Sequence, residues 1–383
     1  MSNKRIVLFI AVASTLFLYF LWDLASTTTL GGGDFWGYWS AAFLLRNGQN
    51  PYDPQAMALV QATQAPTGLS FTIMSWNPPT LFVVILPLTL LSITTAKYIW
   101  LIINLILISA TILLLINLYL HQDTIIPNLL FFIFAFTMPQ ILSGVYVGQV
   151  TILVSFGLVA CMALLKKNQW FWAGTLLIFT TIKPHLVVLQ VIYLIIYMIQ
   201  KKKIQGLIGI FSAGILCLFV LFTLRPQLFE DILGLSKIAP TEWYTPTIGG
   251  WLSFIGAIEL FRYVIILFLP IPFLLVKHHA TFRVEFSIAL LTLITIPFTF
   301  FGWSYDQAIL LIPMAQIFRW LYLSKNKFSI SIISLILITA TGVSYYQKII
   351  GIYEVYYVWI PLFWCLIFGI SWYFSRQPKY AYE

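Results

Sequence analysis

The residues that could do chemistry are concentrated in one short stretch of an otherwise apolar chain. Between Gly33 and Pro54 the sequence places the carboxylates Asp34 and Asp53 among aromatic residues. An aspartate ahead of a helical pattern either caps the helix or offers its carboxylate as a proton acceptor. For Asp53, which Pro54 follows, capping is favoured. For Asp34 both roles stay open.

Two further polar groups interrupt apolar runs. The first is Lys183-Pro184-His185, whose cation either snorkels toward the membrane surface or holds an anion. The second is Trp303-Ser304-Tyr305-Asp306, whose carboxylate is either a helix cap or a site residue. Aromatic residues near these groups, such as Trp243, either stack on a substrate ring or belong to the interfacial belt of a membrane protein.

The composition places the chain in a membrane. Of its 383 residues, 61% are hydrophobic and 9% are charged, and the mean hydropathy is +0.94. A soluble domain carries roughly 25% charged residues. Repeated apolar runs of about 17–25 residues match the length that a helix needs to cross the hydrocarbon core. We therefore predict an all-α, polytopic integral membrane protein that forms a single domain over residues 1–383.

The basic residues set the predicted orientation. The net charge of +9 comes from short Lys/Arg clusters between apolar runs, as the positive-inside rule describes, so we predict no nucleic-acid partner. Counting crossings between clusters gives about twelve helices with both termini inside. The spans are predicted at Ile6–Leu24, Tyr98–Leu120, Ile125–Leu142, Val147–Leu165, Trp170–Ile182, Leu186–Ile199, Ile204–Leu224, Phe261–Val276, Val284–Trp303, Gln307–Leu323, Phe328–Tyr345 and Tyr353–Phe374.

This orientation collects the polar groups on one membrane face. Residues 25–78 form a first external loop and residues 225–250 a second, while Pro79–Leu91 is a re-entrant or interfacial piece. Lys183 lies at the tip of an external hairpin of two short helices, on the same face as Asp34. We therefore expect a site on that face.

Several chemistries find no support in the sequence. The three cysteines are isolated in apolar runs, which predicts no disulfide framework. No His/Cys/carboxylate cluster has the spacing of a metal site, and no glycine-rich loop follows a strand. We therefore predict no metal, no cofactor and no nucleotide-binding module.

The stretch Gly33-Asp34-Phe35 to Asp53-Pro54 resembles the first external loop of glycosyltransferase family 87. The members of this family are membrane mannosyl- and arabinofuranosyltransferases of the GT-C class, and they use polyprenyl-phosphate sugars. Further blocks similar to that family follow in order. They are Trp76-Asn77-Pro78-Pro79-Thr80-Leu81-Phe82 with Leu86-Pro87-Leu88, Gly148-Gln149-Val150-Thr151, Ala173-Gly174 with Ile182-Lys183-Pro184, and Trp303-Ser304-Tyr305-Asp306 with Leu311-Ile312-Pro313. Where related mannosyltransferases often carry a His pair, this chain has Tyr305-Asp306-Gln307.

The resemblance implies a GT-C-like enzyme of the plasma membrane with its active site on the external face. It implies that Asp34 is the catalytic base. The phosphate of the donor would lie against Lys183, His185 and Gln149. The remaining predicted substrate-binding residues are Tyr38, Asp306, Tyr305 and Trp243.

The predicted reaction follows from this resemblance. A hexosyltransferase would move a sugar, most simply mannose, from a polyprenyl-phosphate donor to a glycolipid or cell-envelope glycan. A single displacement with inversion needs one catalytic carboxylate, which suits a lone Asp34. The alternative from another class is a transporter or flippase of lipid-linked saccharides, for which the sequence shows neither internal repeats nor discontinuous helices.

Overall fold

The computed structural model describes residues 32–64, 71–120, 125–238, 243–278, 283–323 and 327–375, and in these ranges every regular element is a helix. The α-helices are α2 (Gly33–Arg46), α3 (Pro54–Gln64), α4 (Thr80–Ile85), α5 (Ile93–Tyr119), α6 (Ile125–Phe136), α7 (Pro139–Val147), α8 (Thr151–Lys166), α9 (Trp170–Leu176), α10 (Val188–Gln200), α11 (Ile204–Leu224), α12 (Leu228–Ile238), α13 (Ile248–Phe254), α14 (Ile271–Lys277), α15 (Val284–Phe298), α16 (Leu311–Leu323), α17 (Lys327–Ile349) and α18 (Trp359–Ser375). The 3₁₀ helices are η1 (Leu86–Leu90), η2 (Leu177–Ile182), η3 (Pro184–Leu186), η4 (Glu259–Phe268), η5 (Ser304–Leu310) and η6 (Glu354–Val358).

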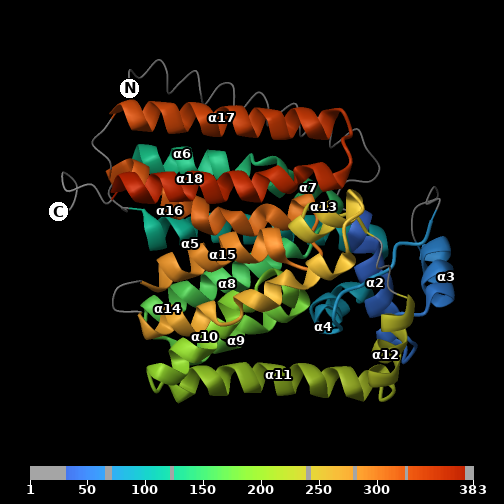
Figure 1. Ribbon diagram of the computed structural model, residues 1–383. Coiled ribbons are helices and arrows are strands. Elements are labelled where there is room, and N and C mark those ends of the chain that lie inside the picture. The colour runs from blue at the N-terminus through green and yellow to red at the C-terminus, as the bar shows by residue number, and fades with distance from the viewer. Residues whose placement is uncertain are drawn as a thin grey trace.

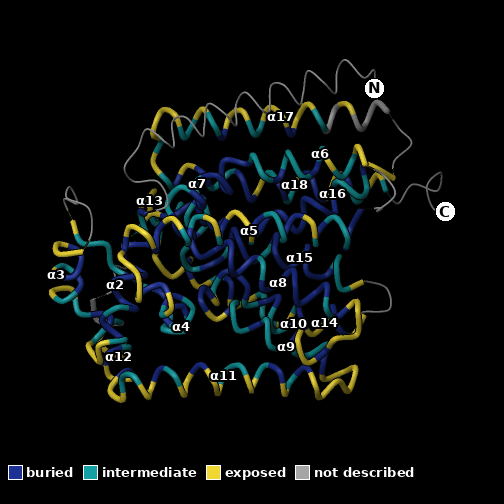
Figure 2. The backbone as a smooth tube through the Cα atoms, turned by 180° about the vertical axis from the view of Figure 1, so that it is seen from behind, coloured by how far each residue is buried: buried dark blue, intermediate teal, exposed yellow. Residues whose placement is uncertain are grey.

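The longer helices lie side by side, with α17 and α11 at opposite edges of the bundle (Figure 1). The short helices α2, α3, α4, α12 and α13 gather at one end, which we call the α2 end. Burial is concentrated around α8 and α15, whereas α11 shows exposed residues along its length (Figure 2). A helix that is as apolar and as exposed as α11 is suited to contact with lipid. The predicted all-α fold is confirmed.

Fewer spans are evident than the sequence predicted. Within the described ranges, four helices are long and apolar enough to cross a membrane, or five if the bent pair α6–α7 forms one span. The other candidates are shorter apolar helices of 10–17 residues. The predicted total of about twelve is therefore not shown. The first predicted span, Ile6–Leu24, lies outside the described residues.

Many helices break before they reach the length of a full crossing. The expectation of continuous helices was wrong for α6 and α7, which are bent by 51° between Phe136 and Pro139. Proline at the first helical position of α7 cannot continue the preceding helix. The same effect separates η2 from η3 at Pro184, where the sequence predicted a hairpin tip. These breaks place irregular backbone, and polar side chains with it, at the α2 end.

The predicted external loops contain helices. Residues 25–78 include α2 and α3, and the segment 225–250 includes α12 and the start of α13. The helical pattern that begins at Asp34 is confirmed, and Asn47-Gly48 ends it, with Gly48 at φ +69°. The predicted re-entrant piece at 79–91 corresponds to the short α4 and η1, which lie next to α2 (Figure 1).

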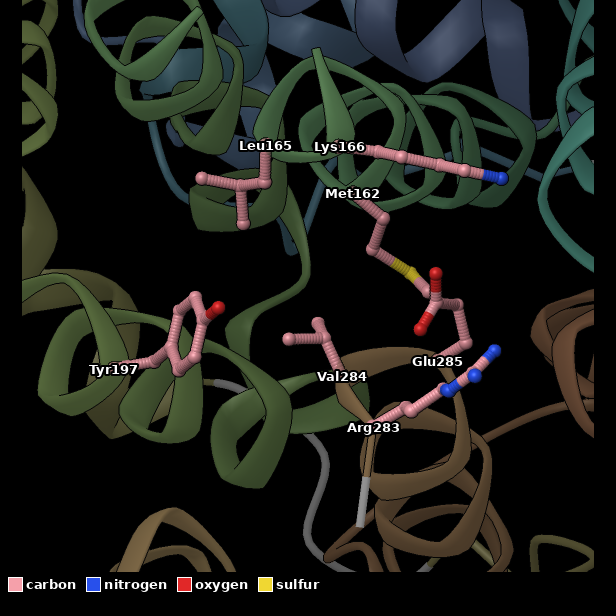
Figure 3. Close-up of a pocket in the computed structure, with 7 residues that line it drawn as sticks. All are labelled: Met162, Leu165, Lys166, Tyr197, Arg283, Val284 and Glu285. Carbon is pink, nitrogen blue, oxygen red and sulfur yellow. The ribbon is translucent and has the colours of Figure 1, made fainter. Parts of the chain in front are cut away.

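The opposite end of the bundle is basic. There the ends of α8 and α10 and the start of α15 line a pocket of about 270 Å³ (Figure 3). Its charged residues are Lys166, Arg283 and Glu285. The charged ends of all three side chains lie on the same side of the pocket (Figure 3). None of the predicted site residues lines this pocket. The residues predicted to do chemistry lie instead toward the α2 end.

Glycines bring α9 and α11 into close contact. A Cβ atom at Gly174 would overlap the Gly206 carbonyl oxygen, and one at Gly209 would overlap the Phe171 carbonyl oxygen. Gly214, on the same helix α11, has no other atom within 4 Å of that position. Small residues allow this approach between membrane helices.

We predict that Gly209→Ala lowers stability by about 1–3 kcal/mol, because the added methyl group forces α9 and α11 apart. Gly214→Ala is the matched control, and alanine at this open helical position is expected to be neutral or to stabilise by up to about 1 kcal/mol. Thermal unfolding of the purified protein in detergent measures both. Equal effects of the two substitutions would contradict the close-contact interpretation.

Candidate active site

Asp34 lies in the first turn of α2, but it does not cap that helix. The N-cap residue is Gly32, and no side chain accepts a hydrogen bond there. Instead, Oδ2 of Asp34 accepts a hydrogen bond from Nε2 of Gln149. Asp53 does cap α3, since its Oδ1 accepts from the backbone N–H of Gln55 at 2.8 Å. Capping thus describes Asp53 and not Asp34, and the Asp34 carboxylate faces another part of the chain.

A tight turn between α7 and α8 positions Gln149. Gly148 ends α7 in the left-handed conformation, with φ +72°, which glycine adopts at no steric cost. The Gly148 carbonyl accepts a 2.8 Å hydrogen bond from Nε1 of Trp100 on α5. Trp100 also stacks on Phe35 of α2 at 5.7 Å between ring centroids. One tryptophan therefore ties the Gln149 turn to the helix that carries Asp34.

Lys183 lies at the break between η2 and η3, and its ammonium group points into the protein. Nζ donates to Oε1 of Gln149 at 2.9 Å and to Oδ1 of Asp306 at 2.7 Å. The side chains of Lys183 and Asp306 are 8% and 3% exposed, so their ion pair is buried. The Gln149 amide bridges Asp34 and Lys183. These are the two residues that we predicted to lie on the same face of the membrane. These contacts do not agree with a snorkelling lysine.

Asp306 serves as both a cap and a member of this group. Its Oδ2 accepts from the backbone N–H of Trp303 at 2.9 Å, at the start of η5. Its Oδ1 accepts from Lys183 and from the hydroxyl of Thr151 at the start of α8. We call the connected set Asp34, Gln149, Lys183, Asp306 and Thr151 the polar chain. It joins α2, α8, η5 and the break before η3.

Two tyrosines flank the polar chain. The ring of Tyr305 lies 5.2 Å from Nζ of Lys183, and its hydroxyl hydrogen-bonds to the Asp34 carboxylate. Tyr38, one turn after Asp34 on α2, is buried beside the same carboxylates. Burial and the charges of Asp34 and Asp306 raise the pKa of both phenols well above their ordinary value. Both tyrosines are therefore neutral hydroxyl groups at physiological pH.

The surroundings of Asp34 favour its proton-accepting role. Burial raises the pKa of its carboxyl above the ordinary value, and the negative charge of Asp306 acts in the same direction. The Lys183 ammonium and the hydrogen bonds from Gln149 and Tyr305 oppose this shift. A carboxylate whose pKa is raised toward the working pH is a better general base than a solvated aspartate.

His185, predicted to lie against the donor phosphate, is in η3 directly after Pro184. Burial lowers its pKa to about 4, with Lys183 adding to that effect and Asp306 opposing it. The imidazole is therefore neutral at pH 7. Its carbonyl accepts a 2.9 Å hydrogen bond from Thr299, which fixes the hairpin against the end of α15. The polar chain contains two carboxyl groups, those of Asp34 and Asp306, and one amine, that of Lys183.

Trp243 belongs to an aromatic cluster beside the polar chain. Its ring lies 5.9 Å from Trp76, 6.3 Å from Phe301 and 5.7 Å from Trp303. Trp303 stacks in turn on Tyr305 at 6.4 Å. We call Trp76, Trp243, Phe301 and Trp303 the aromatic cluster. Each of its members is half-buried.

Some supporting residues were not singled out from the sequence. The side chain of Asn77 donates to the carbonyl of Ile182, directly before Lys183, at 3.4 Å, and the hydroxyl of Tyr52 donates to the Asn77 carbonyl at 3.0 Å. Tyr52 and Asn77 lie in stretches that the sequence analysis singled out. Their roles could not be predicted, because their hydrogen-bond partners are distant along the chain. Among the described residues, no three His, Cys, Asp or Glu side chains are placed to hold a metal ion.

The buried ion pair generates a stability prediction. Lys183→Met removes one partner and leaves the Asp306 charge buried, which we expect to cost about 3–5 kcal/mol. Adding Asp306→Asn removes that charge and should restore part of the loss. Unfolding of the two single variants and the double variant in detergent gives the coupling between the residues. Additive effects would contradict a direct buried pair.

Comparison with known proteins gives one match. The model of glycosyltransferase family 87 matches residues 76–269, about half of the chain. No curated protein and no solved structure matches. The match includes Gln149 and Lys183, whereas Asp34 and Asp306 lie outside it, so their place in the site rests on the geometry above. The chain belongs to glycosyltransferase family 87.

Proposed function

We propose that this membrane glycosyltransferase takes its sugar from a polyprenyl-phosphate donor and transfers it at the α2 end of the bundle. The observation that carries the proposal is the polar chain, in which one amide joins a carboxylate to a buried lysine. This arrangement offers a proton acceptor and an anion-binding group within a few ångströms of one another. Transfer from a lipid phosphate needs both.

Asp34 acts as the base in the proposed reaction. Its carboxylate takes the proton from a hydroxyl of the acceptor as that oxygen forms a bond to the anomeric carbon of the sugar. The bond from this carbon to the phosphate oxygen breaks, and the oxygen keeps the electron pair. The products are the glycosylated acceptor, the polyprenyl phosphate and protonated Asp34. A single displacement of this kind inverts the anomeric carbon.

Lys183 and Gln149 hold the leaving phosphate. The ammonium group of Lys183 is held in place by Asp306 and Gln149, so little reorganisation is needed when negative charge develops beside it. Neutral His185 contributes at most a hydrogen bond, because its pKa is about 4. The proposed reaction requires no cofactor and no metal.

The substrates follow from the same resemblance. The donor sugar is a hexose, most simply mannose, although Tyr305-Asp306-Gln307 replaces a histidine pair of related mannosyltransferases. The acceptor is a glycolipid or a cell-envelope glycan on the outer face of a plasma membrane. Tyr305 lies next to Lys183, and Trp243 belongs to the aromatic cluster. In these positions both side chains can contact a sugar ring.

A transporter of lipid-linked saccharides is the alternative. The bent pair α6–α7 supplies the kind of discontinuous helix that this alternative needs. The family match and the raised pKa of Asp34 favour the enzyme, since transport does not require a general base. The experiment below separates the two, because a transporter forms no glycosidic bond.

We predict that Asp34→Asn lowers transfer of radiolabelled mannose from polyprenyl-phosphate mannose by at least about 100-fold, as loss of a general base does. The assay uses membranes that contain equal amounts of each variant and follows label in the lipid extract. Asp53→Asn is the matched control, because it changes a carboxylate of the same loop that only caps α3.

Full transfer by Asp34→Asn would exclude Asp34 as the base. If the wild type gives no transfer with mannose, the same assay with glucosyl and arabinofuranosyl lipids tests the sugar. Movement of intact donor across the membrane without a new glycosidic bond would support the transporter instead.

The raised pKa of Asp34 predicts a pH dependence. The base acts only when deprotonated, so kcat/KM should rise with pH through the pKa of Asp34, above the ordinary range near about 3.9. Gln149→Leu removes a hydrogen bond that favours the charged carboxylate, so the acidic limb should move to higher pH. Asp53→Asn should leave the limb in place. A limb that stays unchanged in Gln149→Leu would argue that another group titrates.

A further inference from the structure

Arg262 is buried, and no carboxylate of the described residues hydrogen-bonds to its guanidinium group. The residue is 4% exposed, and its Nε, Nη1 and Nη2 atoms make no hydrogen bond to any described residue. Its described contact is with the ring of Phe301, 5.1 Å from the guanidinium carbon. A guanidinium group carries five N–H donors, and leaving them buried and unpaired is costly. Neither the sequence nor the proposed reaction assigns a role to this residue.

Three other cations of the α2 end have carboxylate partners. Lys183 pairs with Asp306, Arg225 with Asp231, and Lys348 with Glu354. Glu259, one turn before Arg262 on η4, is exposed, and its charge acts on the guanidinium without a hydrogen bond between them. Among these cations, Arg262 therefore lacks a hydrogen-bonded carboxylate.

The position of Arg262 is fixed by close packing. A Cβ atom at Gly249 on α13 would lie 2.6 Å from the Arg262 Cα atom, so only glycine lets α13 approach η4 this closely. On the other side of η4 the large apolar side chains are exposed, including Leu260, Tyr263 and Leu267. Arg262 thus lies between a surface suited to lipid chains and the interior of the protein.

The contacts of Arg262 lead toward the polar chain. Phe301 lies 6.3 Å from Trp243, within the aromatic cluster, and that cluster reaches Tyr305 beside Lys183 through Trp303. Phe301 also belongs to the segment in which Thr299 holds the carbonyl of His185. One continuous set of contacts therefore runs from the lipid-facing helix η4 to the proposed active site.

We propose that Arg262 captures the phosphate of the lipid-linked donor at the side of the bundle, between the exposed face of η4 and the aromatic cluster, and that this phosphate lies against Lys183 and Gln149 only when the sugar is transferred. This inference rests on the proposed function. A phosphate accepts two parallel N–H bonds from one guanidinium, which satisfies donors that are otherwise unpaired. The lipid chain of the same molecule would lie along the apolar side chains of η4.

The charge of the polar chain supports a second cation. Lys183 lies among two carboxyl groups, those of Asp34 and Asp306, so a second cation adds to the attraction of this end for an anionic phosphate. Arg262 adds the positive charge that the approaching donor needs. It acts as a binding and positioning residue, whereas the chemistry stays with Asp34 and Lys183.

The test measures binding without turnover. The full-length protein is placed in nanodiscs of neutral lipid, and polyprenyl phosphate is titrated while tryptophan fluorescence is recorded. We expect Arg262→Gln to weaken binding by about 10- to 100-fold, as loss of a charge-assisted contact does. Arg262→Lys keeps the charge but loses the paired donors, so its affinity should lie between those of wild type and Arg262→Gln. Polyprenol, which lacks the phosphate, should bind weakly and equally to all forms.

Two controls separate a binding role from a structural one. Arg225→Gln removes a cation of the same end that is already paired, and it should leave affinity unchanged. Without ligand, Arg262→Gln should melt at the same or a higher temperature than wild type, because it removes an unpaired buried charge. Unchanged affinity in Arg262→Gln, or a large loss of ligand-free stability in both Arg262→Gln and Arg262→Lys, would overturn the proposal.

The source of the phosphate is tested in the same assay. Inorganic phosphate is added as a competitor, and we expect it to compete only at far higher concentration than polyprenyl phosphate. If the two bind equally well, the site is for a free anion and the lipid part of the proposal is wrong.

The outcome is independent of the transfer assay. The assay needs no acceptor and no turnover, so binding of polyprenyl phosphate that depends on Arg262 stands even if no sugar transfer is found. Conversely, transfer by Arg262→Gln with an unchanged KM for the donor would overturn this inference and leave the proposed function intact.

Discussion

A charge inside an apolar bundle must find a partner, because removing an ion from water costs several kcal/mol. Lys183 meets this requirement through Asp306 and Gln149, at 2.7 and 2.9 Å. These three residues come from three separate parts of the chain, so the contacts hold only if η5, the turn before α8 and the break before η3 meet. The ion pair thus sets how the helix ends at the α2 end are arranged, and Asp34 is connected to it through the same Gln149 amide.

The breaks in the helices allow buried polar residues to meet. A continuous membrane helix satisfies its own backbone and offers only side chains to a site, whereas irregular backbone at membrane depth is tolerated where protein surrounds it. The turn at Gly148 and the break at Pro184 occur where Gln149 and Lys183 enter the polar chain. The carbonyls freed there are held by Trp100 and Asn77. The breaks in these helices and the polar site therefore have one structural cause.

Much of this could be predicted from the sequence, for reasons that can be stated. Asp34, Gln149, Lys183 and Asp306 stand out because charged and polar residues are rare in so apolar a chain. The bend at Pro139 was missed because hydropathy continues across it. The neutral state of His185 and the missing partner of Arg262 depend on which distant segments cover them, and residues far apart in sequence supply that cover. Local patterns indicate which residues are unusual, whereas tertiary packing decides their charge and their partners.

The same packing controls how readily Asp34 accepts a proton in the proposed reaction. Burial keeps the Asp34 carboxyl ready to accept a proton, and Lys183 limits how far its pKa rises. A phosphate bound at Lys183 shares that cation with Asp306, so the donor weakens the ammonium's hold on the Asp34 charge and makes the carboxylate a stronger base. Donor binding and proton acceptance are therefore coupled through one lysine. On this view Asp306 holds Lys183 in place before the donor arrives, and the lysine need not move when it does.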